Sequence, residues 1–223
     1  MMWRWLPALL FCLGLLAAGL AVLPSEAAPT KLPKRAVLPV LVRGEEFPTP
    51  TPTPTPTPRP PVYDGPVSSL YLASANLRGQ WPIQEMDTYW TPSGEVFQDP
   101  PAPQVIAHYR RFGNPGRPGT NSIFAAHVNY VGFGSGPFAS LTSATPGDAL
   151  YVRMADGSEY AYTVRSVVVV PLDWLDMNAV VYPPLDAHTE RVTLISCGGT
   201  FIPFAVGGEY TSRVILVAER WVP

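Results

Sequence analysis

Residues 192–201 read VTLISCGGTF, an apolar run rich in β-branched residues that ends at Cys197 and is followed by two glycines. Such residues favour strands, so the run predicts a β-strand with Cys197 at its end. A side chain at the edge of a buried strand is held rigidly and remains accessible. The pair Gly198-Gly199 would let a peptide backbone approach the sulfur closely.

Two further segments have the same design. Residues 120–130, TNSIFAAHVNY, predict a strand that ends at His127, and residues 209–219, EYTSRVILVAE, predict one entered through Arg213. A neighbouring imidazole can take the proton of a thiol and later protonate a leaving amine. A guanidinium beside the site can stabilise an oxyanion or hold the substrate backbone.

The residues alone leave each of these roles open. His127 can equally be a structural histidine at a strand end, and His108 and His188 are rival bases. Arg213 can be a solvated residue where a strand begins. A single cysteine such as Cys197 is more often a buried structural residue than a nucleophile.

The rest of the domain repeats short apolar runs separated by Gly and Pro, which is typical of strands joined by turns. We predict strands at residues 69–75, 80–86, 104–109, 121–127, 149–154, 159–170, 191–197 and 213–219. Asp156-Gly157 predicts a hairpin turn between the fifth and sixth strands. Short helices are expected near residues 137–141 and 172–178. The pattern indicates an all-β barrel or sandwich.

The N-terminus predicts export. Residues 5–23 form an uncharged apolar run after Arg4, about as long as a membrane-spanning helix. We favour an uncleaved signal-anchor with Arg4 in the cytoplasm, because the run is longer than the core of a usual signal peptide. The alternative is a signal peptide cut near Ser25-Glu26-Ala27. In either case the remaining chain lies outside the cytoplasm.

A proline-rich linker separates this segment (residues 1–23) from the globular domain. Residues 24–66 lack hydrophobic periodicity and contain PTPTPTPTPTP at positions 48–58. Alternating proline favours an extended polyproline II conformation, which suits a stalk. The domain then occupies residues 67–223.

Charge and cysteine content narrow the function further. The net charge of −2 does not favour binding of nucleic acid. The two cysteines are Cys12, in the apolar segment, and Cys197. Cys197 is therefore a lone thiol in a compartment where thiols usually pair.

Together these motifs resemble the sortases, the cell-surface cysteine transpeptidases. TLISC at residues 193–197 is similar to the family's TLxTC strand, and AAH at residues 125–127 to its AGH. RVILVA at residues 213–218 resembles the strand that carries the family's arginine. FGNPGRPGTNSIFAAH, GPFASLTSATPGDALYV and CGGTF…GGEY extend the similarity over about residues 67–220, and the last is most like class F sortases. Ser196 and Ala126 depart from the family's usual Thr and Gly, which leaves substrate specificity in doubt more than activity.

The resemblance implies an eight-stranded sortase β-barrel in which Cys197, His127 and Arg213 are catalytic. It implies cleavage of an LPxTG-like sorting signal through a thioester on the cysteine, followed by transfer to an amine. Neither a metal ion nor an organic cofactor is expected. Partners would be secreted proteins that carry the signal, and an amine from a cell-wall peptide or another protein. The loop at residues 171–190 would wall the signal's pocket with apolar side chains: Leu172, Trp174, Leu175, Val180, Val181 and Tyr182.

Two rival functions remain at this point. The first is a different cysteine acyl-transfer enzyme, but the motifs of two such classes fit poorly. An L,D-transpeptidase places a glycine between its serine and cysteine, whereas Ser196 directly precedes Cys197, and papain-like enzymes place the cysteine before the histidine, the reverse of the order here. A membrane-tethered β-barrel that binds peptides or wall polymer without catalysis is the rival from another class.

Overall fold

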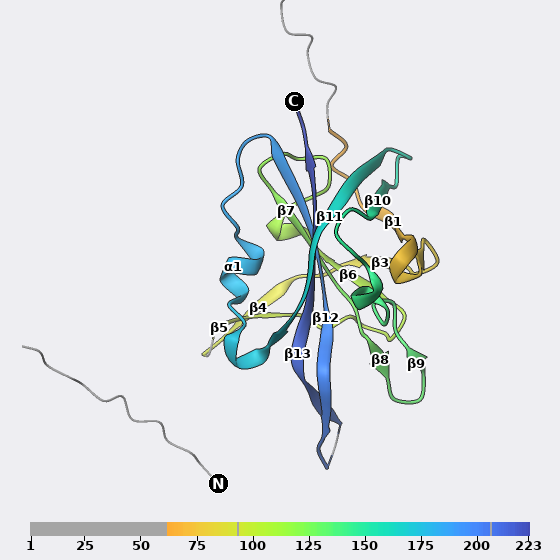
Figure 1. The fold of residues 1–223 in the computed structure, drawn as a ribbon, viewed down its shortest axis with the longest axis vertical. Coiled ribbons are helices and arrows are strands. Elements are labelled where there is room, and N and C mark those ends of the chain that lie inside the picture. Colours follow the sequence, from red (N-terminus) through yellow and green to blue (C-terminus); the bar gives the residue numbers. More distant parts are fainter. Residues whose placement is uncertain (1–61, 93, 206) are drawn as a thin grey trace, which may run out of the picture. The chain divides into compact units, whose positions relative to one another are not determined.

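Strands dominate the computed structural model, which describes residues 62–92, 94–205 and 207–223 (Figure 1). The predicted apolar N-terminal segment and all but the end of the predicted linker lie outside the described residues. Among the described residues, no helix has both the length and the apolar character needed to cross a bilayer.

Short elements connect or flank a few long strands. The strands are β1 Val67–Leu72, β2 Leu77–Arg78, β3 Ile83–Glu85, β4 Thr88–Thr91, β5 Gly94–Phe97, β6 Ile106–Tyr109, β7 Asn121–Ala125, β8 Asn129–Tyr130, β9 Gly134–Ser135, β10 Ala149–Met154, β11 Glu159–Pro171, β12 Thr189–Pro203 and β13 Gly208–Trp221. The helices are α1 Met177–Val181 and the 3₁₀ turns η1 Ala73–Ala75, η2 Arg110–Phe112, η3 Leu141–Ser143 and η4 Leu172–Trp174.

Nine strands form one sheet in the order β2-β1-β10-β11-β13-β12-β7-β6-β3. The pairs β12–β7 and β6–β3 run parallel, and the other neighbours run antiparallel. The sheet curls around its core, because Leu72 of β1 and Ile106 of β6 come from opposite parts of the strand order and pack in the same buried cluster. Separate hairpins are formed by β4–β5 and β8–β9.

The all-β prediction is confirmed, and each of the eight predicted strands is present. The two-residue strand β2 adds a ninth, and β2 and β3 lie at the two ends of the strand order, so the sheet is a curled sheet and not the expected eight-stranded barrel. The hairpin turn at Asp156-Gly157 is confirmed, with Gly157 at φ +89°. Residues 172–178 contain η4 and the start of α1, whereas η3 begins at Leu141, the last residue of the other predicted helix.

Different elements pack on the two faces of the sheet. Alternation in β10 buries Leu150, Val152 and Met154 in the central core and exposes the residues between them. On the other face, α1 packs through Val181 against Ile123 of β7. This second cluster also contains Ala125 and Ile195, which lie two residues before His127 and Cys197, and Ile215, which lies two residues after Arg213.

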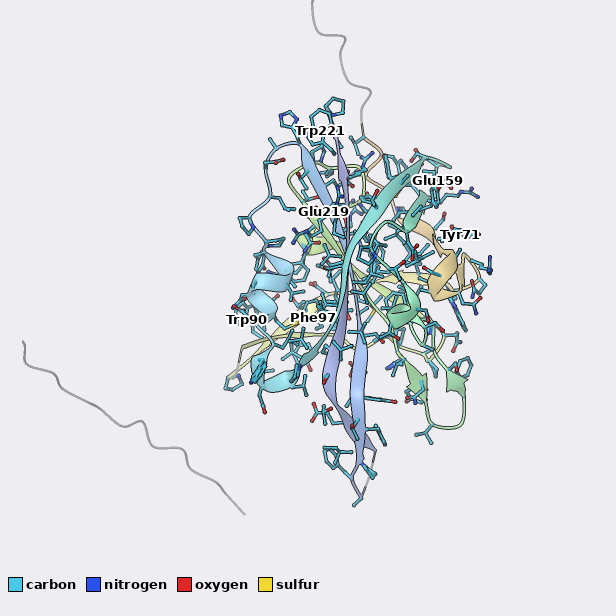
Figure 2. The ribbon with its side chains drawn as sticks, viewed as in Figure 1. Tyr71, Trp90, Phe97, Glu159, Glu219 and Trp221 are labelled. Atoms are coloured by element: carbon cyan, nitrogen blue, oxygen red, sulfur yellow. The ribbon has the colours of Figure 1, made fainter. Side chains whose placement is uncertain are left out.

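A buried ion pair ties together the end of the sheet remote from those residues. Glu190 is fully buried, and its carboxylate accepts from Arg220 at 2.6 Å and from the Tyr162 hydroxyl. It also accepts from the backbone N–H of Gly116 at 2.5 Å. Trp221, at the same end, is labelled at the top of Figure 2.

Candidate active site

Cys197 and Arg213 are paired across two adjacent strands. The antiparallel ladder of β12 and β13 places them directly opposite each other. Side chains of directly opposite residues lie on the same face of a sheet. The thiol and the guanidinium therefore share one face, which is the α1 side, because Ile195 and Ile215 pack in the α1 cluster at a spacing of two residues from each.

His127 reaches the same place from the third strand. β7 runs parallel to β12, and their last register pair is Ala125 with Ile195. The N–H of Ala126 donates to the carbonyl of Ile195 at 3.3 Å, so the two chains remain in contact as β7 ends. His127 and Cys197 each follow that last pair by two residues, which puts them at the same level on the same face.

Two hollows meet at these side chains. A hollow of about 410 Å³ lies on the α1 side, and we call it the α1-side hollow. Its lining residues are Glu95, Val96, Phe97, Asp99, Pro100, Tyr109, Ala125, Ala126, His127, Leu172, Leu175, Met177, Ile195, Ser196, Cys197 and Arg213. A second hollow of about 640 Å³, the hairpin-side hollow, is lined by His127, Val128, Asn129, Tyr130, Val131, Gly134, Cys197, Phe201, Gly207, Gly208 and Tyr210. Cys197 and His127 line both hollows.

Burial and charge act in opposite directions on the thiol. Cys197 is a half-buried free cysteine. Burial raises the pKa of its thiol, the Arg213 cation lowers that pKa, and the carboxylates of Asp99 and Glu209 raise it. Burial is the largest of these effects, so the pKa of the thiol lies above its ordinary value.

Arg213 is oriented by its own strand. One guanidinium nitrogen, Nη1, donates to the carbonyls of Ser212 at 3.1 Å and Tyr210 at 3.4 Å. The other, Nη2, lies 3.9 Å from Glu209 Oε1. These contacts leave donor capacity on a planar group that has five N–H bonds, so Arg213 can also donate to a bound carbonyl or oxyanion.

The His127 backbone is fixed by the turn that follows it. Its carbonyl accepts from the N–H of Phe138 at 3.1 Å, and a Cβ on Gly136 would lie only 2.3 Å from the same oxygen. The imidazole packs edge-on against the ring of Tyr130, with 5.3 Å between centroids. Within the described residues no hydrogen bond joins the imidazole to Cys197.

The rival histidines serve the structure. His108 is fully buried, stacks on Phe124, and its Nε2 lies 3.2 Å from the carbonyl of Gly113. Burial lowers the pKa of His108 to about 4, which keeps it neutral. His188 stacks on Trp221 at the remote end of the sheet. The structure therefore brings only His127 of the three histidines to Cys197.

The backbone geometry after Cys197 explains why two glycines follow it. The ladder of β12 and β13 is interrupted between Gly198 and Phe201, which marks a β-bulge. Gly199 has φ +76°, and a Cβ there would lie 2.5 Å from Thr211 Oγ1. The glycine pair therefore lets the hairpin continue past the thiol, in addition to the close approach expected from the sequence.

The predicted loop at residues 171–190 contributes to the wall in part. Leu172 and Leu175 line the α1-side hollow, as does Met177. Val181 packs in the core instead, and Trp174 and Tyr182 are exposed and do not line that hollow.

Sequence reasoning missed a buried clamp between this loop and the site strands. Asn121 accepts at Oδ1 from the Thr193 hydroxyl at 2.8 Å, and its amide nitrogen donates to the carbonyls of Val180 at 2.9 Å and Val181 at 3.3 Å. The clamp joins β7, β12 and the C-terminal half of α1. An asparagine at the start of a buried strand was the only available signal.

Asp99 was also missed. It follows β5, lines the α1-side hollow and is solvent-exposed. Its side chain makes no hydrogen bond or ion pair with the other described residues. Packing of Phe97 on Tyr109, with 4.6 Å between ring centroids, holds this segment against β6.

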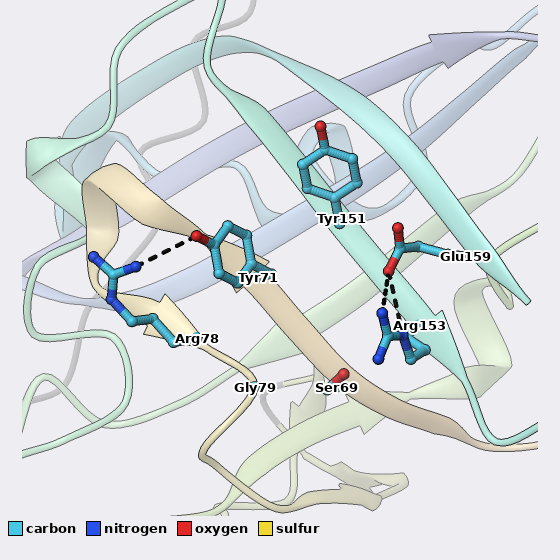
Figure 3. A pocket seen from close by; sticks show the side chains of 7 residues that line it. All are labelled: Ser69, Tyr71, Arg78, Gly79, Tyr151, Arg153 and Glu159. Carbon is cyan, nitrogen blue, oxygen red and sulfur yellow. Dashed lines mark hydrogen bonds and ion pairs between the residues drawn. The ribbon is translucent and has the colours of Figure 1, made fainter. Parts of the chain in front are cut away.

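A separate hollow of about 240 Å³ lies over β1 and β10 (Figure 3). Arg153 pairs there with Glu159 at 2.9 Å, and Arg78 donates to the Tyr71 hydroxyl at 3.3 Å. Its lining contains neither cysteine nor histidine, so it lacks the thiol and imidazole that line the other two hollows.

Comparison with known proteins identifies the family. A family sequence profile described as Sortase domain matches residues 80–221. Similar solved structures include sortase A from Corynebacterium diphtheriae, with 21% identity and a TM-score of 0.49 over 70% of this chain and 61% of that chain. Another is sortase C-1 from Actinomyces oris, with 21% identity and a TM-score of 0.48 over 69% of this chain and 72% of that chain. A third is the SrtA sortase from Actinomyces oris, with 19% identity and a TM-score of 0.47 over 72% of this chain and 82% of that chain. No curated protein sequence matches the chain significantly.

The chain spans about three fifths of the Corynebacterium diphtheriae sortase A chain. The profile match covers more than half of the present chain and includes Cys197, His127 and Arg213. Sortases are generally cysteine transpeptidases, which agrees with a thiol, an imidazole and a guanidinium on one face. The chain belongs to the sortase family.

Proposed function

We propose that this sortase cleaves an LPxTG-like sorting signal through a thioester on Cys197 and transfers the acyl group to an amine. The observation that carries the proposal is the convergence of Cys197, His127 and Arg213, from three neighbouring strands, where two hollows meet. A non-catalytic binding protein would have no need for this set of groups at one point.

The two hollows suit two substrates. The α1-side hollow contains Arg213 and the apolar side chains of Leu172 and Leu175, which fit the Leu-Pro part of a sorting signal. The hairpin-side hollow contains Cys197 and His127 without Arg213, and it would admit the amine. Sequential use of both sides of one sulfur is what a two-step acyl transfer requires.

The first step forms the thioester. The Cys197 sulfur attacks the carbonyl carbon of the scissile peptide bond, and its proton passes to His127. His127 then donates that proton to the amide nitrogen, the C–N bond breaks, and the C-terminal peptide leaves as an amine. Arg213 stabilises the oxyanion between attack and bond cleavage.

The second step reverses the roles. The incoming amine attacks the thioester carbon and gives a proton to His127. The C–S bond breaks, a new amide forms, and the proton returns to the sulfur. Enzyme and acid–base group are thus restored, and no redox change occurs.

Location and subgroup extend this proposal. Residues 5–23 would anchor the enzyme in the membrane, with the proline-rich linker carrying the domain on the outer side. CGGTF…GGEY supports a place among the class F sortases. Substrates would be secreted proteins with the signal, and acceptors would be wall peptides or other proteins with a free amine.

A ligation assay tests the reaction. Residues 56–223 contain the core clusters and the strands of the described structure, so this unit can be used without the apolar segment. Incubated with an LPxTG peptide and a glycine-based amine, it should yield ligated peptide, whereas the Cys197→Ala variant should yield none. Ligation by Cys197→Ala at the parent rate would refute the assignment.

A further inference from the structure

Two hairpins beside the candidate site expose apolar side chains at one end of the sheet. They are Tyr130, Val131 and Phe133 on the β8–β9 hairpin and Phe201, Ile202 and Phe204 on the β12–β13 hairpin. We call these six side chains the hairpin tips. Both hairpins project at the end of the sheet opposite the C-terminus (Figure 1). Val131 is 87% exposed and Phe204 57% exposed.

The hairpin tips lie in sequence without charge. Residues 128–147 and residues 196–208 contain no Asp, Glu, Lys or Arg. Two acidic side chains, Asp173 and Glu209, line a hollow together with Ile202 and Phe204. Soluble proteins normally place charges at exposed hairpin ends, and a gathered apolar surface marks an interaction site.

We propose that the hairpin tips insert into the interfacial region of a lipid bilayer. The inference rests on the proposed membrane location of the enzyme. Tyr and Phe are side chains that favour the membrane–water boundary, and apolar burial there is favourable without specific contacts. Membrane contact at this end would set the hairpin-side hollow against the bilayer surface.

The linker is long enough for this orientation. The described chain begins near Val62, which lies beside Gly116 at the remote end of the sheet from the hairpin tips. Residues 24–61, if extended as predicted, would span about 120 Å. β12 has 15 residues and a length of about 50 Å. An anchor at residues 5–23 can therefore hold the domain with its opposite end turned towards the same membrane.

Lipid fits the hairpin tips better than a folded protein does. The tips are protruding ends of two separate hairpins, and Val131 at the turn of β8–β9 is almost fully exposed. A rigid partner would need matching cavities for both protrusions, whereas a lipid interface deforms around them. The acidic neighbours Asp173 and Glu209 also predict that anionic lipid adds nothing to binding.

Vesicle flotation of residues 56–223 tests the proposal without the apolar N-terminal segment. The unit should float with phosphatidylcholine vesicles, and neither added phosphatidylglycerol nor high salt should strengthen the association. The variant Phe133→Ser/Ile202→Thr/Phe204→Ser removes three hairpin tips that line neither the α1-side nor the hairpin-side hollow. It should lose vesicle association by at least about tenfold.

A matched control replaces three exposed aromatic residues elsewhere, Tyr89→Ser/Trp90→Ser/Trp221→Ser, and should float like the parent. Both variants should ligate soluble peptides at the parent rate, which separates this inference from the proposed reaction. Failure of the parent to float, or equal loss in the control, would overturn the proposal. Loss of ligation of soluble peptides in the hairpin-tip variant would also overturn it, because the tips would then bind polypeptide.

Discussion

Cys197 and Arg213 are direct partners in the antiparallel ladder of β12 and β13, so the cation lies beside the thiol without a connecting loop. The Arg213 cation lowers the pKa of the thiol, and in the proposed mechanism it also stabilises the oxyanion. The two roles can be separated, because the first needs only a positive charge and the second needs directed donors.

Replacement of Arg213 should therefore have a graded effect. Arg213→Ala should raise the pKa of Cys197 further, and it should lower kcat for ligation by about 100-fold or more. Arg213→Lys should have a pH profile of thiol alkylation close to that of the parent, because it keeps the positive charge. Its kcat should remain close to that of Arg213→Ala. Parent-like kcat in Arg213→Lys would show that a point charge is sufficient.

Removing a carboxylate should make the thiol more reactive. The Asp99 carboxylate raises the pKa of Cys197, so Asp99→Asn should lower it and speed alkylation by iodoacetamide at neutral pH. The pH profile of alkylation should move to lower pH. Glu95→Gln is the matched control, because Glu95 lines the same hollow but pairs with Arg111 and is not among the groups that shift the pKa of the thiol. An equal shift in both variants would contradict this account.

The three histidines should differ in their effect. His127→Ala should abolish detectable ligation, since the proton carrier is lost. His188→Ala should keep the parent rate, because His188 lies against Trp221 at the remote end of the sheet. Rates from the ligation assay decide, and retained activity in His127→Ala would move the acid–base role elsewhere.

The clamp at Asn121 should affect the α1-side hollow. Asn121→Ala removes the bonds to Thr193 and to α1, so we expect a loss of about 1–3 kcal/mol in the free energy of unfolding. KM for the sorting-signal peptide should rise more than kcat falls, because the loop that carries Leu175 and Met177 loses its attachment. Ser122→Ala is the control: its hydroxyl is buried without a partner among the described residues, and its removal should cost little. Equal urea midpoints for both variants would refute the clamp.

The remote ion pair should serve stability alone. Glu190→Gln leaves Arg220 without its partner and should cost about 3 kcal/mol, near the low end for buried pairs because Arg220 is partly exposed. Glu159→Gln, in the exposed pair with Arg153, should cost less than about 1 kcal/mol. Urea unfolding measures both values. A kcat below the parent value in folded Glu190→Gln would contradict a purely structural role.

The site strands were predictable because their signals are local. Apolar runs of β-branched residues end or begin at Cys197, His127 and Arg213, and a strand presents such residues at its edge whatever the rest of the fold does. The eight predicted strands follow from the same patterns. The two-residue strands β2, β8 and β9 are too short to produce a pattern, and their pairing depends on the turns between them.

The features that were missed depend on contacts far apart in the sequence. Asp99 approaches the thiol because Phe97 packs on Tyr109, and Asn121 reaches α1 across some 60 residues of chain. No local pattern encodes either contact. The roles of His108 and His188 likewise required the structure, because burial of one and remoteness of the other are tertiary properties.

The central claim is that Cys197 forms a thioester with the substrate. Intact mass spectrometry of residues 56–223, after brief incubation with an LPxTG peptide and no added amine, tests it most directly. The account predicts a mass increase equal to the peptide's N-terminal fragment up to the threonine, less one water, on the parent, and its absence in Cys197→Ala. An adduct of the same mass on Cys197→Ala, or ligation by the parent without any adduct on Cys197, would contradict it.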